Sequence, residues 1–310
     1  MFHMSQQSIN FTGRVAIVTG AGNGLGRSHA LALARRGAKV VVNDLGGARD
    51  GAGNSLQAAD EVVAQIQAMG GEAIANGANV ANFSEVEAMV AQVMERWGRV
   101  DILLNNAGIL RDKSFSRMDL ADFRLVMDVH LMGSVNCTKA VWEIMRAQNY
   151  GRIVMTTSSS GLYGNFGQSN YGAAKMAVVG LMNTLALEGQ KHDIRVNALA
   201  PTAATRMTED LLDKAVFELL TPESVTAGAL MLCHEGAPQR TILCAGAGGY
   251  ATTRIFETNG VFLPPALQTP ESVLATWDAI CDTTDQCALE AGFKQTEKFL
   301  SKAAASFGNQ

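Results

Sequence analysis

Residues 14–26 read RVAIVTGAGNGLG, an apolar run that leads directly into a glycine-rich turn. The run Arg14–Thr19 is continuously apolar after its first residue, which is typical of a strand buried on both faces of a parallel sheet. The glycines that follow permit a tight turn, and the next segment, Leu25–Arg36, has the length of a helix. A strand, a glycine-rich turn and a helix in this order predict a nucleotide-binding βα unit.

The same alternation of short apolar runs and helix-length segments continues along most of the chain. Further strands are predicted at Lys39–Asn43, Glu72–Asn76, Asp101–Asn105, Arg152–Thr157, Ile194–Leu199 and Thr241–Cys244. Further helices are predicted at Ser55–Met69, Ser84–Trp97, Asp119–Gln148, Ser169–Gly189 and Thr221–His234. Ser84 and Glu87 have the spacing of a capping box. We therefore predict an α/β fold with a Rossmann-type, doubly wound parallel sheet of about seven strands and helices on both faces.

Composition and charge exclude several classes of protein. The chain has 310 residues, 47% of them hydrophobic, and a formal net charge of −4. These values predict a large apolar core and argue against nucleic acid or an anionic membrane surface as the main partner. The apolar stretches are much shorter than the roughly 20 residues of a membrane helix. The 5 Cys contain no CxxC pair and the 5 His lack metal-ligand spacing, so we expect free thiols and no metal site.

The two ends of the sequence bear on location. Residues 1–10 lack the basic and then apolar layout of a signal peptide. Residues 308–310, Gly-Asn-Gln, are not a peroxisomal address. We therefore expect a cytoplasmic protein.

The glycine-rich turn predicts the position of a dinucleotide pyrophosphate. Free N–H groups and the positive dipole end of the following helix attract phosphate, and the residues assigned to this contact are Gly20, Asn23, Gly24, Leu25 and Gly26. Asp44 ends the second predicted strand, where a carboxylate can accept both ribose hydroxyls and repel the extra phosphate of NADP. Because neither Asn23 nor Leu45 is basic, we predict NAD as the cofactor.

Polar and small residues follow two further predicted strands. Asn79 and Val80 come after the third strand, where they could meet the adenine edge. Asn106, Ala107 and Gly108 come at the end of the fourth strand, where small residues let the backbone approach the cofactor. Asn105, directly before them, fits a cofactor contact and a purely structural role equally well.

Tyr171 and Lys175 lie four residues apart in a predicted helix, which places their side chains on one face. A nearby ammonium favours the phenolate, so we expect Lys175 to lower the pKa of Tyr171 and also to hydrogen bond the nicotinamide ribose. Ser158 follows the fifth strand, where its hydroxyl could hold a substrate oxygen while Tyr171 transfers a proton. Positions 157, 159 and 160 also carry hydroxyls, which leaves the choice of serine open on chemistry alone.

Together these motifs resemble the short-chain dehydrogenase/reductase family, from roughly Gly13 to Gly249. The resemblance implies a Rossmann-type sheet, hydride transfer to C4 of a nicotinamide, a small-molecule substrate and a homodimer or homotetramer. It also implies that Ser158, Tyr171 and Lys175 are catalytic and that Tyr171 and Lys175 contact the cofactor.

Longer stretches resemble the (3R)-hydroxyacyl-CoA dehydrogenase unit of peroxisomal multifunctional enzymes of type 2. They are NDLGG at 43–47, NAGILRDKSF at 106–115 and GLYGNFGQ at 161–168. The chain is too short for the hydratase portion, so it is similar to a stand-alone bacterial-type relative. The resemblance implies oxidation of a (3R)-3-hydroxyacyl-CoA to a 3-oxoacyl-CoA, in fatty-acid or sterol side-chain degradation. Arg111, Lys113 and Arg117 could then meet CoA phosphates, or form a solvated basic loop.

Two alternatives remain open. The first is a 17β-type hydroxysteroid dehydrogenase on the same scaffold. The second is a non-catalytic NAD-binding scaffold, which would be expected to have a damaged Ser-Tyr-Lys set, whereas all three residues are present here.

Three positions depart from the family pattern. His130 stands where the family usually has an Asn whose backbone holds a water of a proton relay, so we include His130 in the catalytic set. Pro201-Thr202 replaces the common Pro-Gly, and we assign nicotinamide contacts to Pro201 and Thr205. Asn79 stands where Asp is commoner, which would weaken the adenine contact.

The domain organisation follows from where the alternation of strands and helices ends. Residues 1–250 are predicted as one NAD-binding and catalytic domain. Residues 251–310 are predicted as a C-terminal extension packed on the same domain, with a helix from Pro270 to Cys281.

Overall fold

The computed structural model describes residues 8–47, 50–51, 53, 55–203 and 219–307. The chain divides into two compact units, Met1–Thr252 and Thr253–Gln310. The boundary lies within two residues of the one predicted from the sequence. That the second unit packs on the first stays a prediction.

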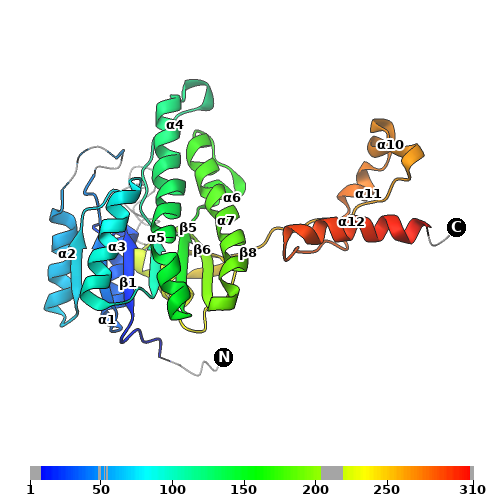
Figure 1. Ribbon diagram of the computed structural model, residues 1–310. Coiled ribbons are helices and arrows are strands. Elements are labelled where there is room, and N and C mark those ends of the chain that lie inside the picture. Colours follow the sequence, from blue (N-terminus) through cyan, green and yellow to red (C-terminus); the bar gives the residue numbers. More distant parts are fainter. Residues whose placement is uncertain (1–7, 48–49, 52, 54, 204–218, 308–310) are drawn as a thin grey trace. The chain divides into compact units, whose positions relative to one another are not determined.

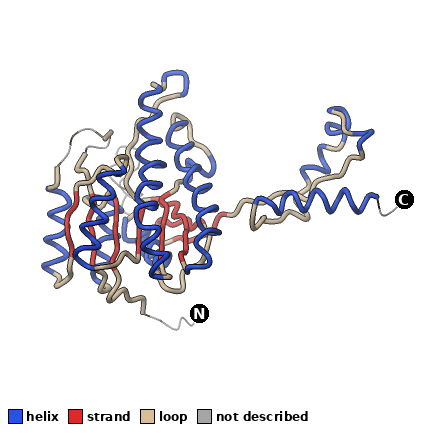
Figure 2. The backbone as a smooth tube through the Cα atoms, in the orientation of Figure 1, coloured by secondary structure: helices blue, strands red, loops and turns tan. Residues whose placement is uncertain are grey.

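The first unit is built around one eight-stranded sheet with the order β3-β2-β1-β4-β5-β6-β7-β8. Its strands are β1 Val15–Thr19, β2 Lys39–Asn43, β3 Ala73–Asn76, β4 Ile102–Asn105, β5 Gly151–Thr156, β6 Ile194–Thr202, β7 Ile242–Gly246 and β8 Gly249–Thr253. All pairs from β3 to β7 are parallel. The doubly wound sheet is thereby confirmed, with β8 as an edge strand that the sequence did not predict. Figures 1 and 2 show the strands side by side between helices.

Alternate residues of the central strands enter two separate cores. Ala16 and Val18 of β1 pack in one core, and Val15 and Ile17 pack in the other. All five residues of β1 are buried, as the continuous apolar run predicted. Burial on both faces follows from helices that cover each side of a parallel sheet.

Helices cover both faces of the sheet. They are α1 Gly24–Arg35, α2 Gln57–Ala68, α3 Phe83–Trp97, α4 Leu120–Met127, α5 Gly133–Gln148, α6 Ser159–Tyr163, α7 Ser169–Gly189 and α9 Pro222–Cys233. Residues of α1, α2 and α9 enter the first core, and residues of α3, α5 and α7 enter the second. Helices on both faces are what a doubly wound, Rossmann-type sheet requires.

Two local predictions about helices are wrong. The helix predicted at Asp119–Gln148 is interrupted by a π-helical turn, Asp128–Met132, between α4 and α5. The helix α3 is capped by Asn82, whose side chain accepts from the N–H of Ser84 at 3.1 Å, and not by Ser84. The Glu85 carboxylate supports this earlier start. It accepts from the Asn82 amide and from the Asn79 N–H, both at 2.8 Å.

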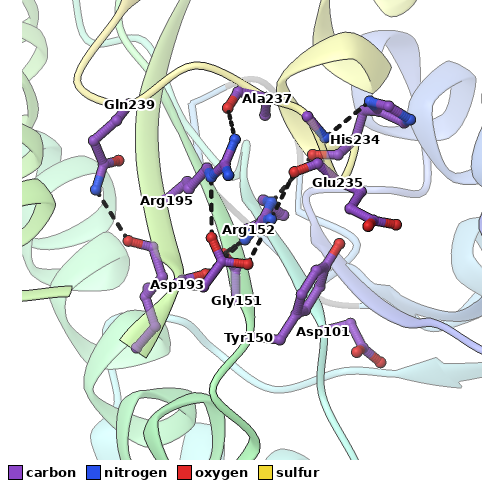
Figure 3. A network of polar contacts seen from close by, with 12 residues as sticks. Asp101, Tyr150, Gly151, Arg152, Asp193, Arg195, His234, Glu235, Ala237 and Gln239 are labelled. Carbon is purple, nitrogen blue, oxygen red and sulfur yellow. Dashed lines mark hydrogen bonds and ion pairs between the residues drawn. The ribbon is translucent and has the colours of Figure 1, made fainter. Parts of the chain in front are cut away.

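A buried arginine, Arg152, connects the chain segments at the amino ends of β5 and β6 (Figure 3). The guanidinium of Arg152 donates to the carboxylate of Asp193 at 3.0 Å, and to the backbone carbonyls of Gly151, Asp193, His234 and Glu235. The Tyr150 ring lies 4.2 Å from its central carbon. The five N–H donors of an arginine are thus used to hold the fold, at the edge opposite to the carboxyl ends of the strands.

The second unit contains three α-helices within its described residues, α10 Pro270–Ala275, α11 Trp277–Cys281 and α12 Gly292–Phe307. The predicted helix Pro270–Cys281 is therefore broken at Thr276, and α12 was not predicted. Glu257 and Cys287 exchange two backbone hydrogen bonds, of 2.9 and 3.0 Å. All 5 cysteines of the chain are free thiols, as predicted.

Candidate active site

The glycine-rich turn after β1 has no room for side chains. Gly20 has a φ of 62°, and a Cβ there would lie 2.8 Å from the Cα of Ala107. A Cβ at Gly26 would overlap the carbonyl oxygen of Gly20. Both glycines are required because β1, the turn and α1 pack backbone against backbone, which is the close approach that a pyrophosphate site needs.

The amino end of α1 is left without a side-chain cap. Asn23 is its N-cap residue, but its side chain forms no capping hydrogen bond, and the first turn holds no acidic residue. By contrast, α3 is capped by Asn82, α4 by Asp119 and α9 by Thr221. The helices α2, α5 and α7 also lack a side-chain cap, but only α1 begins at the glycine-rich turn, where an uncapped amino end fits a dinucleotide phosphate.

Asp44 lies directly beside this turn. One carboxylate oxygen accepts the Gly22 N–H at 2.7 Å and the other accepts the Gly46 N–H at 2.7 Å. Each oxygen keeps lone-pair capacity for a further donor, such as a ribose hydroxyl. Asp44 thus both shapes the turn and fits the role predicted for it.

Residues at the end of β4 tie that strand to β1. The Asn106 amide donates to the carbonyl oxygens of Thr19 and Gly20, at 2.9 and 3.0 Å. The Thr19 hydroxyl accepts from the N–H groups of Asn106 and Ala107, both at 3.0 Å. Sequence reasoning missed Thr19, although its position directly before Gly20 was a usable signal. The two strand ends, and hence Ala107 and Gly108, are held against the glycine-rich turn.

Asn105 has a structural role. Its amide donates to the Thr138 hydroxyl at 3.2 Å and contacts the Met155 sulfur at 3.4 Å. The side chain is buried and faces α5 and β5. These contacts support the structural alternative, although the Asn105 Oδ1 is buried without a hydrogen-bond partner among the described residues.

The predicted adenine contacts lie after β3. Asn79 is held by Glu85 through its N–H and accepts from the Ala81 N–H at 3.0 Å. Val80 is buried, and its carbonyl accepts from the Asn136 amide at 2.9 Å. Both residues are thus fixed beside the carboxyl ends of β2 and β3, and their contact with adenine stays a prediction.

The Ser158 hydroxyl lies close enough to the Tyr171 side chain to lower its pKa. Ser158 begins α6, and its Oγ also accepts from the Ser160 N–H at 3.2 Å. Tyr171 lies in the first turn of α7. Ser158 is thereby distinguished from the neighbouring hydroxyls, since Thr157 is fully buried and donates to the Lys175 carbonyl at 2.6 Å.

Lys175 is buried behind Tyr171. Its Nζ donates to the Thr156 carbonyl at 2.7 Å and lies 5.4 Å from the centre of the Tyr171 ring. Burial lowers the pKa of Lys175 to about 7. An ammonium that is easily deprotonated is a weak source of charge for its neighbours.

Burial also raises the pKa of Tyr171, the neighbouring Ser158 hydroxyl lowers it, and the Asp112 carboxylate raises it. The prediction that Lys175 lowers the pKa of Tyr171 is therefore wrong for this structure. Two groups that share a desolvated pocket are both pushed toward their neutral forms. The neutral phenol is a proton donor as it stands.

His130 lies in the π-helical turn, with its ring edge-on to that of Tyr171 at 5.2 Å between centres. Its Nε2 contacts the backbone of Ile109, at 3.1 Å from the nitrogen and 2.8 Å from the oxygen. A Cβ at Gly108 would collide with the His130 ring. Burial and the charge of Lys175 lower the pKa of His130 well below its ordinary value. The neutral ring therefore packs between Tyr171 and the loop after β4.

Asn170 is a site residue that sequence reasoning missed. It is fully buried, its amide donates to the Arg111 carbonyl at 3.0 Å, and its Oδ1 accepts from the Tyr171 N–H at 2.7 Å. It fixes the loop after β4 against the start of α7. An amide directly before the tyrosine motif was the available signal.

The remaining predicted contacts are less well defined. Pro201 lies in β6 and pairs with Ala245, whereas Thr205 lies outside the described residues. Arg111 and Lys113, considered for CoA phosphates, both form ion pairs with Asp122, at 2.8 and 3.2 Å. These two cations therefore support the loop and α4.

Comparison with known proteins identifies close relatives. A family model described as "short chain dehydrogenase" matches residues 14–215. Peroxisomal multifunctional enzyme type 2 of Mus musculus is 49% identical over 280 residues, which are 88% of this chain and 37% of that protein. A putative short-chain type dehydrogenase/reductase of Mycobacterium tuberculosis is 48% identical over 284 residues, 91% of this chain and 98% of that protein. The chain thus spans less than half of the mouse relative and nearly all of the mycobacterial one.

Two solved structures also match this chain. Full-length peroxisomal multifunctional enzyme type 2 from Drosophila melanogaster matches with a TM-score of 0.79 and 39% identity, over 94% of this chain and 50% of that one. A 7α-hydroxysteroid dehydrogenase complexed with NADH and 7-oxo glycochenodeoxycholic acid matches with a TM-score of 0.70 and 30% identity, over 80% of this chain and 98% of that one. Among the described residues, no helix has the length and apolarity needed to cross a membrane.

Proposed function

Because this chain belongs to the short-chain dehydrogenase family, we propose that it oxidises the secondary alcohol of a (3R)-3-hydroxyacyl-CoA to a 3-oxoacyl-CoA, with NAD as the oxidant. One observation carries the proposal. Ser158 follows β5 beside Tyr171, and Lys175 is buried next to them, while the amino end of α1, which lacks a side-chain cap, follows β1 of the same sheet. Such ends of neighbouring strands form the crevice in which doubly wound folds bind ligands.

When bound, NAD would supply the acceptor for the hydride of the carbinol carbon. Ser158 would hold the substrate oxygen by hydrogen bonding, and Tyr171, after giving its own proton to solvent, would take the hydroxyl proton as a phenolate. In the reverse direction the neutral Tyr171 phenol donates its proton to the carbonyl oxygen. Lys175, fixed by Thr156, would hold the nicotinamide ribose. His130 keeps the Tyr171 ring in place through its edge-on contact.

The acyl-CoA substrate is supported by similarity to proteins named peroxisomal multifunctional enzyme type 2. A place in fatty-acid or sterol side-chain degradation follows from that substrate class. We expect a homodimer or homotetramer in the cytoplasm.

A hydroxysteroid is the second candidate substrate. It is favoured by the structural match to a 7α-hydroxysteroid dehydrogenase. The two candidates are separated by measuring NADH formation with a series of (3R)-3-hydroxyacyl-CoA thioesters and with 17β-hydroxysteroids. Turnover of steroids alone would contradict the proposal, and turnover of neither class would favour a non-catalytic NAD-binding protein.

Tyr171→Phe tests the chemistry. The phenyl ring keeps the packing against His130 but cannot transfer a proton, so turnover is expected to fall by roughly 100-fold or more. The variant is expected still to bind NAD, which is measured by the change in protein fluorescence. Near-native turnover with the cofactor bound would overturn the proposed mechanism.

A further inference from the structure

The side-chain amide of Gln168 connects three segments around the candidate catalytic pair. Its Nε2 donates to the Asp112 carboxylate at 2.7 Å, and its Oε1 accepts from the Ser160 hydroxyl at 2.7 Å and from the Asn165 amide at 3.0 Å. A carboxylate only accepts hydrogen bonds, so Asp112 fixes which end of the amide faces the loop after β4. The other end must then face Ser160.

Gln168 is linked to Ser158 through its side chain and to the residue after Tyr171 through its backbone. The Ser160 N–H donates to the Ser158 Oγ at 3.2 Å. The Gln168 carbonyl accepts the Gly172 N–H at 2.7 Å, next to Tyr171 in the first turn of α7. Gln168 therefore links the turn that carries Ser158 to the helix that carries Tyr171.

The loop after β4 is fixed beside Gln168 by a backbone hydrogen bond. The Lys113 N–H donates to the Gly167 carbonyl at 2.9 Å, which places Asp112 opposite the Gln168 amide. The cations on either side of Asp112, Arg111 and Lys113, are engaged by Asp122. The negative charge of Asp112 is thus directed at a neutral amide donor, and replacing that donor by an acceptor would produce repulsion.

We infer that Asp112 and Gln168 are positioning residues, which act through Ser160 and the first turn of α7 to hold the Ser158 and Tyr171 side chains next to each other. Neither residue is assigned a contact with the reacting atoms. The inference rests on the proposed function, in which Ser158 and Tyr171 carry the chemistry.

The polarity of the pair allows a test by charge relocation. Gln168→Glu places two carboxylates against each other, and kcat is expected to fall by about 10- to 100-fold while the KM for NAD changes by less than about 3-fold. Adding Asp112→Asn reverses the pair, because the asparagine amide donates to the carboxylate introduced at position 168, which still accepts from Ser160 and Asn165. The double variant is therefore expected to regain kcat to within about 3-fold of the parent.

Two further variants separate positioning from general damage. Gln67→Glu makes the same change on the exposed surface of α2 and is expected to leave kcat unchanged. Gln168→Met removes both ends of the amide, so Asp112→Asn is expected not to rescue it. All variants are assayed with NAD and (3R)-3-hydroxydecanoyl-CoA, after circular dichroism confirms folding.

The outcomes distinguish this inference from the proposed function. The positioning role is wrong if the kcat of Gln168→Glu equals that of the parent. It is also wrong if the loss of kcat in the double variant equals the product of the losses in the two single variants. Those results leave the chemistry of Tyr171 intact when Tyr171→Phe is inactive. If Tyr171→Phe is active, the proposed function fails whatever the double-variant cycle shows.

Discussion

At the scale of single residues, burial controls the chemistry of the candidate site. Lys175 and Tyr171 share a pocket from which water is excluded, and each is shifted toward its neutral form. The lysine therefore reduces the stability of the fold at the pH values where it carries charge in the unfolded chain.

Lys175→Met is expected to stabilise the protein while abolishing turnover. The pKa of Lys175 is 10.5 in the unfolded chain and about 7 in the folded one, so wild-type stability falls as the pH drops from about 10.5 to about 7. The variant does not show this loss. Near pH 7 its free energy of unfolding is expected to exceed that of the wild type by up to about 4 kcal/mol, once the lost hydrogen bond to Thr156 is taken into account. Urea unfolding at about pH 7 and pH 10 measures the difference. An equal effect at both pH values would contradict the burial argument.

Asp44 is expected to set the choice of cofactor. Its carboxylate, held by the Gly22 and Gly46 N–H groups, would repel the extra phosphate of NADP. We expect kcat/KM for NAD to exceed that for NADP by roughly 100-fold, and Asp44→Ala to reduce this ratio by about 10-fold or more. Steady-state kinetics with both cofactors measures the ratio, and an unchanged ratio in the variant would remove Asp44 from the site.

At the scale of elements, a polar contact lies inside the apolar packing of α1 against α9. The Thr226 hydroxyl donates to Ser28 at 2.8 Å, so it must accept from His29 Nδ1, also 2.8 Å away. The His29 Nε2 is then unprotonated, and it is buried with no hydrogen-bond partner among the described residues. Protonation would place an unpaired charge between the two helices.

Acid is therefore expected to weaken the contact between α1 and α9. Burial lowers the pKa of His29 to about 4 from 6.5, so the unfolded chain binds the proton first and stability falls as the pH drops from about 6.5 to about 4. The loss from His29 is about 3 kcal/mol. His29→Gln is expected to show a shallower decline in urea unfolding, with the remaining decline due in part to His130, whose pKa is also lowered. Parallel curves for both proteins would be evidence against this assignment.

At the scale of the whole molecule, the residues assigned to the cofactor site lie in one of the two units. Every described residue assigned to NAD or to catalysis belongs to the unit Met1–Thr252. A chain that ends at Ile255 keeps β8 whole and is expected to bind NAD within about 3-fold of the full chain. Isothermal titration of both chains gives the comparison. A loss of more than about 10-fold would mean that the second unit supports the cofactor site.

The sequence by itself predicted the strands β1 to β7 and the candidate catalytic set, but neither β8 nor α6. Continuous apolar runs indicated most of these strands, because strands buried on both faces need apolar side chains at every position, whereas β3 is fully buried only at Ala73. Ser158, Tyr171 and Asp44 could be placed at strand ends or helix starts because parallel topology brings such positions to one edge of the sheet. These inferences depend on local pattern and connectivity, both of which are present in the chain as written.

Tertiary structure decided what local pattern does not contain. The π-helical turn at His130 depends on its packing against Gly108 and Tyr171, and α6 depends on hydrogen bonds that reach from Gln168 to Ser160. The pKa of Tyr171 is raised, opposite to the direction that its spacing to Lys175 predicted, because burial is set by residues distant in the sequence. Spacing in the chain brought the tyrosine and lysine together, and the surrounding fold determined how readily each holds its proton.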